Sequence, residues 1–219
     1  MVRNVLTALA VGGSVGAAAL ALAADPGRPQ APLAVSRAAR CPGTFRWPVK
    51  TMSDPSARGS WASARPKVTT VHALVHRTDR PRRLTASTPR QRGAERTIFR
   101  VRARLVGARA SDSSSAAGDG DIRLVIADPT TDETMVAAFP DPNCAPASHS
   151  PKRSQMTTAR VSFIARCQFP PLGRFATLHG TATITGVGFW AAKGNGRGAA
   201  RNGIELHPGL GFTGAGCSR

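Results

Sequence analysis

Residues 97–106 read Thr-Ile-Phe-Arg-Val-Arg-Ala-Arg-Leu-Val, and each of the three arginines in this stretch is flanked by apolar residues. Successive side chains of a β-strand point to opposite faces. This spacing therefore places Arg100, Arg102 and Arg104 on one face of a strand and the apolar residues on the other. The stretch predicts a strand with one face in a hydrophobic core and the other in solvent.

The remaining patterns predict a protein built mainly from β-strands. Alternating or apolar runs predict further strands over residues 68–75, 122–127, 134–139, 175–189 and 204–212. One helix is expected over residues 154–166, because its apolar residues fall near one face and Pro170 and Pro171 follow it. With residues 122–127 and 134–139 taken as one hairpin, three strand regions, a helix and two more strands match the element order of an OB-type barrel. We expect a small, disulfide-stabilised, OB-like barrel with one helix, and a β-sandwich is the alternative.

The amino terminus has the features of a secretory signal. A short basic start precedes residues 5–24, which carry no charge and end in small residues. A single transmembrane anchor is the alternative, since this run approaches the roughly 20 residues that span a bilayer. The expected organisation is a signal peptide over 1–23, a flexible leader over 24–40 and a single β-rich domain over 41–219. It predicts a secreted, periplasmic or cell-envelope location, with no membrane span once the signal is cleaved.

Export permits disulfides, and the chain has four cysteines that allow three pairings. The favoured pairing joins Cys144 to Cys167 and Cys41 to Cys217, although the sequence leaves all three pairings open. No two cysteines are spaced C-x-x-C, so neither a zinc ribbon nor a thiol redox pair is indicated. No cofactor and no metal ion are expected.

Positive charge dominates the chain and is unevenly distributed. The 219 residues carry 30 Lys or Arg against 12 Asp or Glu, a formal net charge of +18. Residues 58–109 carry 14 basic and two acidic residues, whereas residues 110–141 carry one and seven. A strongly basic region of this kind is typical of proteins that bind polyanions.

The strand face of Arg100, Arg102 and Arg104 is the main candidate for polyanion binding, with Arg123 as a contributor from a neighbouring strand. Alternate strand positions are about 7 Å apart, a spacing that suits successive phosphate groups. Aromatic residues make up only 5% of the chain, so base stacking is not indicated and binding would be sequence-blind. The expected partner is nucleic acid or an anionic envelope polymer. The alternative is a solvated strand face whose charges bind nothing specific. The acidic segment 110–141 is a second alternative, as an internal partner that neutralises the arginines.

A second hypothesis is a secreted hydrolase, such as a nuclease or phosphodiesterase. Glu205 and His207 lie two residues apart in a predicted strand, so a carboxylate and an imidazole point the same way. Such a pair can act as a general base, with Asn202 orienting the substrate. The alternative is an ion pair that holds a strand end. His72 and His76 have the spacing of two metalloprotease histidines, but the predicted strand and the missing glutamate between them argue against a metal site.

Residues 120–128 read GDIRLVIAD, residues 182–189 ATITGVGF and residues 202–208 NGIELHP. Together these stretches resemble a group of bacterial proteins, many of them exported, that share the motifs GDIHLVIAD, ATITGVGFFD and NGIELHPV and have no assigned activity. Arg123 replaces a histidine of that pattern, and Trp190-Ala191 replaces Phe-Asp. The resemblance therefore implies a binding or structural role rather than catalysis. A structural envelope protein without a ligand is the third hypothesis.

Overall fold

The strand that carries the alternating arginines pairs with four other strands and organises the sheet. The computed structural model describes residue 41 and residues 45–114, 118–193 and 196–218. Within these residues, this strand, β2 (Ile98–Ala110), pairs with β1 (Lys67–Thr69), β3 (Ile122–Ala127), β5 (Ala176–Thr177) and β6 (Thr181–Trp190). The predicted signal peptide and leader, residues 1–40, lie outside the described residues.

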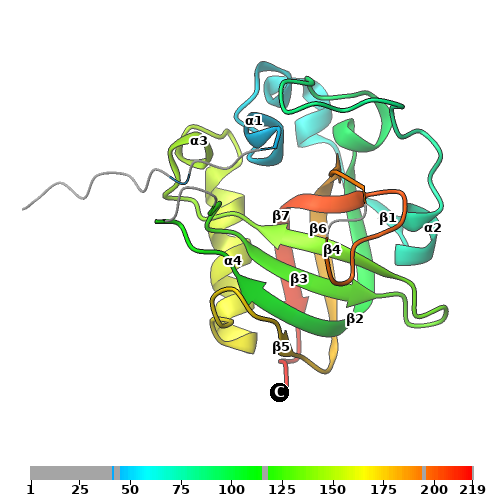
Figure 1. Cartoon of the computed structure of the whole chain (residues 1–219), viewed down its shortest axis with the longest axis vertical. Helices are drawn as coiled ribbons and strands as arrows, with labels where there is room; N and C mark the ends of the chain where they lie inside the picture. Colours follow the sequence, from blue (N-terminus) through cyan, green and yellow to red (C-terminus); the bar gives the residue numbers. More distant parts are fainter. Residues whose placement is uncertain (1–40, 42–44, 115–117, 194–195, 219) are drawn as a thin grey trace, which may run out of the picture. The chain divides into compact units, whose positions relative to one another are not determined.

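Five strands close into a barrel in the order β2-β3-β4-β7-β6 and back to β2 (Figure 1). β4 (Thr134–Phe139) and β7 (Ile204–Gly214) are parallel, and the other neighbours in the ring are antiparallel. The longest helix, α4 (Arg153–Cys167), connects β4 to β6. The expectation of a mainly β, OB-like barrel is confirmed, and the sandwich alternative is not observed.

Short helices that the sequence patterns did not predict surround the barrel. They are α1 (Trp47–Lys50), α2 (Val71–Val75), α3 (Ala145–Ser148) and 3-10 helices at Pro55–Arg58, Ser60–Ser63 and Gly93–Arg96. The predicted helix is found as α4. No helix in the described ranges is both long and apolar enough to cross a membrane.

The barrel interior is filled by the apolar faces of the strands, and α4 packs against β7 and β4. Phe163 of α4 stacks on Phe139 of β4 at 5.5 Å between ring centroids and meets Phe212 of β7 edge-on at 5.3 Å. Phe139 and Phe163 are fully buried. Burial of each such side chain contributes on the order of 1.5–3 kcal/mol, so the α4 contact is a major part of the core.

The strand predicted over residues 68–75 is correct only at its start. β1 ends at Thr69, and residues 71–75 form the helix α2. The Thr70 hydroxyl accepts a hydrogen bond from Ala73 N at 3.0 Å and caps this helix. Val71 and Leu74, three residues apart, are buried on the same side. In so short an apolar run the two-residue period of a strand and the 3.6-residue period of a helix fit equally well. The strand prediction for residues 71–75 was therefore wrong.

The strand predicted over residues 175–189 is divided into β5 and β6. The break lies at Gly180, whose φ of +115° is a backbone conformation that glycine adopts without strain. β5 pairs with β2 outside the barrel ring, whereas β6 closes the ring. The other strands begin and end within a few residues of their predicted limits.

The favoured disulfide pairing is wrong. Cys41 is joined to Cys144 and Cys167 to Cys217, with Cα separations of 5.3 and 4.7 Å. Cys144 precedes α4, and Cys167 is its last residue. A helix of 15 residues is about 22 Å long, whereas a disulfide needs Cα atoms within about 7 Å. The helix therefore holds Cys144 and Cys167 apart and carries Cys167 to the end of β7.

Candidate functional site

Glu205 and His207 belong to a group of ionic side chains on the outer face of the barrel, which we call the buried cluster. His207 Nε2 lies 3.1 Å from Asp121 Oδ2, and His207 Nδ1 lies 3.5 Å from Glu205 Oε2. Arg123 donates a hydrogen bond of 3.1 Å to Glu205 Oε1. The side chains of His207 and Asp121 are fully buried, and that of Glu205 is 5% exposed.

The segment that carries α1 covers this cluster. Phe45 packs edge-on against Phe189, and Phe189 packs edge-on against His207 at 5.6 Å. Lys50 of α1 lies 3.7 Å from Asp119. The sheet below and this segment above exclude water from the imidazole.

Burial and opposite charge set the protonation of the buried cluster. Burial by itself raises the pKa of Glu205, but the close contact with His207 and the charge of Arg123 outweigh it and lower the pKa to about 2. Burial lowers the pKa of His207, but the attraction of Asp121 and the contact with Glu205 outweigh it, so the pKa is raised. Burial raises the pKa of Asp121. The buried cluster places the imidazole of His207 between two carboxyl groups that favour its protonated form.

The spacing of Glu205 and His207 brings them to one face, but their environment is that of a structural ion pair. A general base needs contact with the proton that it removes, and a buried imidazole offers no such contact without movement of the covering segment. Asn202 is not part of the cluster. Its side-chain amide donates to Leu74 O at 3.0 Å and to Arg77 O at 3.2 Å, so it joins α2 to the start of β7.

The three arginines of β2 lie on an exposed face, which we call the arginine face. Arg100, Arg102 and Arg104 are all exposed, and they lie opposite Thr185, Thr183 and Thr181 of β6 in the antiparallel register. Each cationic group thus lies beside a hydroxyl group of the neighbouring strand. Both residue types form hydrogen bonds to phosphate oxygens.

The acidic segment leaves most of the arginine face unneutralised. Arg104 forms an ion pair with Asp132. Among the described residues, Arg100 and Arg102 form no ion pair, because other acidic groups of this segment contact Lys50, His207 and backbone N–H groups. Arg123 is separate from this face, since it lies opposite Arg109 and contacts Glu205.

Two shallow depressions flank Arg100. Their volumes are about 290 and 300 Å³, and Arg100, Thr185 and Gly211 line both. Lys152 and Gln155 line the first depression. The arginine face therefore continues into hollows that can receive an anionic group.

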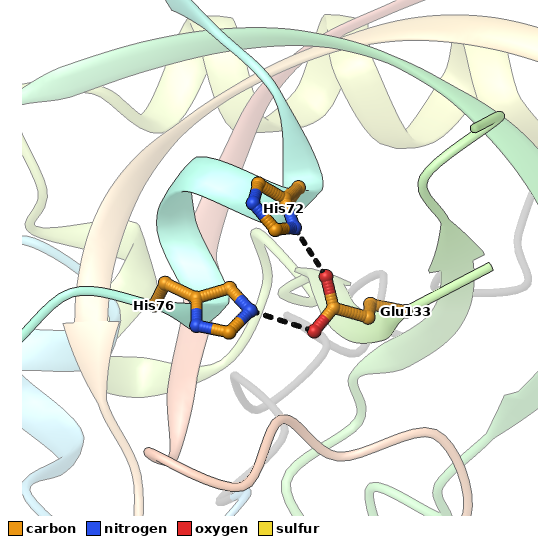
Figure 2. A group of neighbouring side chains, drawn as sticks. All are labelled: His72, His76 and Glu133. Carbon is orange, nitrogen blue, oxygen red and sulfur yellow. Dashed lines mark hydrogen bonds and ion pairs between the residues drawn. The ribbon is translucent and has the colours of Figure 1, made fainter. Parts of the chain in front are cut away.

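A third group, which we call the histidine–glutamate group, consists of His72, His76 and Glu133. Because residues 71–75 form a helix, His72 and His76 are one turn apart and face the same way. His72 Nδ1 lies 2.6 Å from Glu133 Oε2, and His76 Nε2 lies 2.8 Å from Glu133 Oε1 (Figure 2). The hydrogen bond with His72 lowers the pKa of Glu133.

Asp128 fixes the two elements of this group relative to each other. Its carboxylate accepts hydrogen bonds from His72 N at 2.9 Å and from Thr130 N at 3.0 Å. One side chain therefore anchors both α2 and the β3–β4 turn that ends at Glu133. Glu133 is a member of this group that the sequence did not predict, because the histidines fitted a strand pattern and the carboxylate lies 57 residues after His76.

Comparisons with protein families, with characterised proteins and with solved structures found no significant match to this chain.

Proposed function

We propose that the protein binds polyanions, such as nucleic acid or an anionic envelope polymer, through the arginine face of β2. The observation that carries this proposal is the exposure of Arg100 and Arg102 on one strand face without an acidic partner among the described residues. Like charges in a row are unfavourable unless a ligand or an acidic group neutralises them. A polyanion supplies that charge and releases counterions when it binds.

The face favours binding that does not depend on base sequence. Threonine hydroxyl groups of β6 and Lys152 accompany the arginines, and all of these groups form hydrogen bonds to phosphate oxygens. Aromatic residues, on which bases stack, make up only 5% of the chain. We include export to the cell envelope or medium in this proposal. The two disulfides support it, since such bonds persist in oxidising compartments.

The test is the salt dependence of binding to a single-stranded oligonucleotide and to inorganic polyphosphate. We expect affinity to fall steeply with salt, and Arg100→Gln/Arg102→Gln to reduce the log–log slope by roughly 0.7 for each lost contact. Arg82→Gln/Arg83→Gln removes the same charge from two exposed loop residues and is the matched control. An equal change in both variants, or an unchanged slope in the first, would contradict the proposal.

A further inference from the structure

Two elements distant in sequence bring together the side chains of a metal site. The donor atoms of His72, His76 and Glu133 all lie within 4.8 Å of one another. Two imidazole nitrogens and one carboxylate are a ligand set that zinc uses where it keeps a further coordination position open. We propose that the histidine–glutamate group binds a divalent transition-metal ion of the zinc class.

The distances are close to those that a bound ion requires. Two ligands that each lie about 2.0–2.1 Å from a tetrahedral zinc ion are about 3.3 Å apart. The two nitrogens lie 2.6 and 2.8 Å from the Glu133 oxygens, so each has to move outward by less than about 1 Å. The side chains of His72 and His76 are 52% and 60% exposed and have room for this movement.

The backbone below these ligands is already held in place. Asp128 anchors the start of α2 to the turn before Glu133, and Asn202 holds the end of α2 through Leu74 O. The hydroxyl of Thr131 donates to Glu133 Oε2 at 3.0 Å and orients the carboxylate. An ion therefore binds without the entropic cost of ordering two loops.

Fold stability does not explain this arrangement. An exposed ion pair contributes at most about 1 kcal/mol, because solvent screens it. Five hydrogen-bonding side chains nonetheless converge on the turn. They are Asp128, Thr131 and Glu133 of the turn itself and His72 and His76 from the α2 segment. All four cysteines are in disulfides, so no thiol of the chain competes with the imidazoles for a soft metal ion.

A bound ion would remain accessible from solvent. His76 and Glu133 line a cleft of about 690 Å³ together with Asp132, Arg201 and Asn202. Water or an anionic oxygen ligand can therefore reach an ion at this position, with the Arg201 guanidinium nearby. The buried cluster lacks this access.

The test uses the full chain with its disulfides formed, titrated with Zn²⁺ by calorimetry and with Co²⁺ by visible absorption. We expect one ion per chain and a Co²⁺ spectrum of low coordination number. Glu133→Gln keeps a hydrogen-bonding side chain of the same size but removes the anionic ligand. It should weaken binding at least as much as the roughly 10- to 100-fold loss seen for outer-shell partners. His72→Gln/His76→Gln should abolish binding, whereas His149→Gln, an exposed histidine elsewhere, should leave it unchanged.

Thermal unfolding provides the second measurement. Zn²⁺ should raise the melting temperature of the native chain and of His149→Gln, but not that of the double histidine variant, since an ion that binds only the folded state stabilises it. Equal Zn²⁺ affinity in the native chain and the double variant would overturn the proposal. So would absence of binding in a native chain that is folded. Arg100→Gln/Arg102→Gln should keep Zn²⁺ binding. The metal-binding proposal and the polyanion-binding proposal can therefore be contradicted independently of each other.

Discussion

The buried cluster and the histidine–glutamate group both bring histidine side chains into contact with carboxyl groups, but in opposite environments. Asp121 immediately precedes β3, and Glu133 immediately precedes β4, so the two groups lie at opposite ends of one hairpin. His207 is fully buried between two carboxyl groups, whereas His72 and His76 share one carboxylate at the surface. In the first group, the buried histidine has carboxylate oxygens of opposite charge at 3.1 and 3.5 Å, and solvent does not reach it. The second group can exchange its hydrogen bonds for an external ligand.

Contact between histidine and carboxylate side chains therefore does not by itself indicate a functional site. Desolvation makes a buried ion expensive unless a partner is fixed beside it, so such groups become structural elements. Solvent access makes the same contacts weak and replaceable. Burial therefore decides which group stabilises the fold and which is available for binding.

The largest expected effect separates the two groups by stability. His207→Ala leaves Asp121 and Glu205 buried without their shared cation, and we expect a loss of about 3–5 kcal/mol in the free energy of unfolding. Chemical denaturation measures it, with His149→Ala as the exposed control. A loss below about 1 kcal/mol would show that His207 contributes no more to stability than an ordinary surface residue, and would contradict this prediction.

The next effect concerns the arginine of the buried cluster. Arg123→Met removes one partner of Glu205, but His207 remains beside it, so the expected loss is about 1–3 kcal/mol. Arg104→Met is the matched variant, because Arg104 pairs with the exposed Asp132. It should cost at most about 1 kcal/mol. Equal losses in the two variants, measured by denaturation, would show that burial does not distinguish these ion pairs.

The pH dependence of stability should come from the buried histidine. Because its folded-state pKa is raised above 6.5, the contribution of His207 is fully present below pH 6.5 and is lost as pH rises through the folded-state value. The free energy of unfolding should therefore fall above pH 6.5, with a slope of at most about 1.4 kcal/mol per pH unit for one group. Denaturation at a series of pH values measures this decline. The decline should persist in His72→Gln/His76→Gln, and its disappearance there would assign it to the exposed histidines.

The smallest expected effect is that of the exposed histidines on stability without metal. His72→Gln/His76→Gln should change the free energy of unfolding by no more than about 0.5 kcal/mol, since both side chains are more than half exposed. Denaturation in the presence of a chelator provides the measurement. A loss comparable to that of His207→Ala would make this group a structural element as well.

Patterns that extend over a whole strand or helix predicted most of the fold. The alternation around Arg100 predicted β2, because one buried face imposes a two-residue period over a whole strand. The short apolar runs predicted β3 and β4 closely, because almost every residue of these two strands is buried. The run over residues 204–212 predicted β7. The same reasoning failed over residues 68–75. There the apolar run is short. The helix is stabilised instead by the cap at Thr70 and by the hydrogen bond from His72 N to Asp128.

The fold class, the arginine face of β2 and the common direction of Glu205 and His207 could all be predicted from the amino-acid pattern alone. Each of these follows from spacing along one strand. The disulfide pairing, the burial of His207 and the contact of Glu133 with His72 and His76 depend on tertiary packing. Local periodicity records only which residues share a face. Which distant residues lie opposite that face, and whether water reaches it, depends on how helix and barrel pack together.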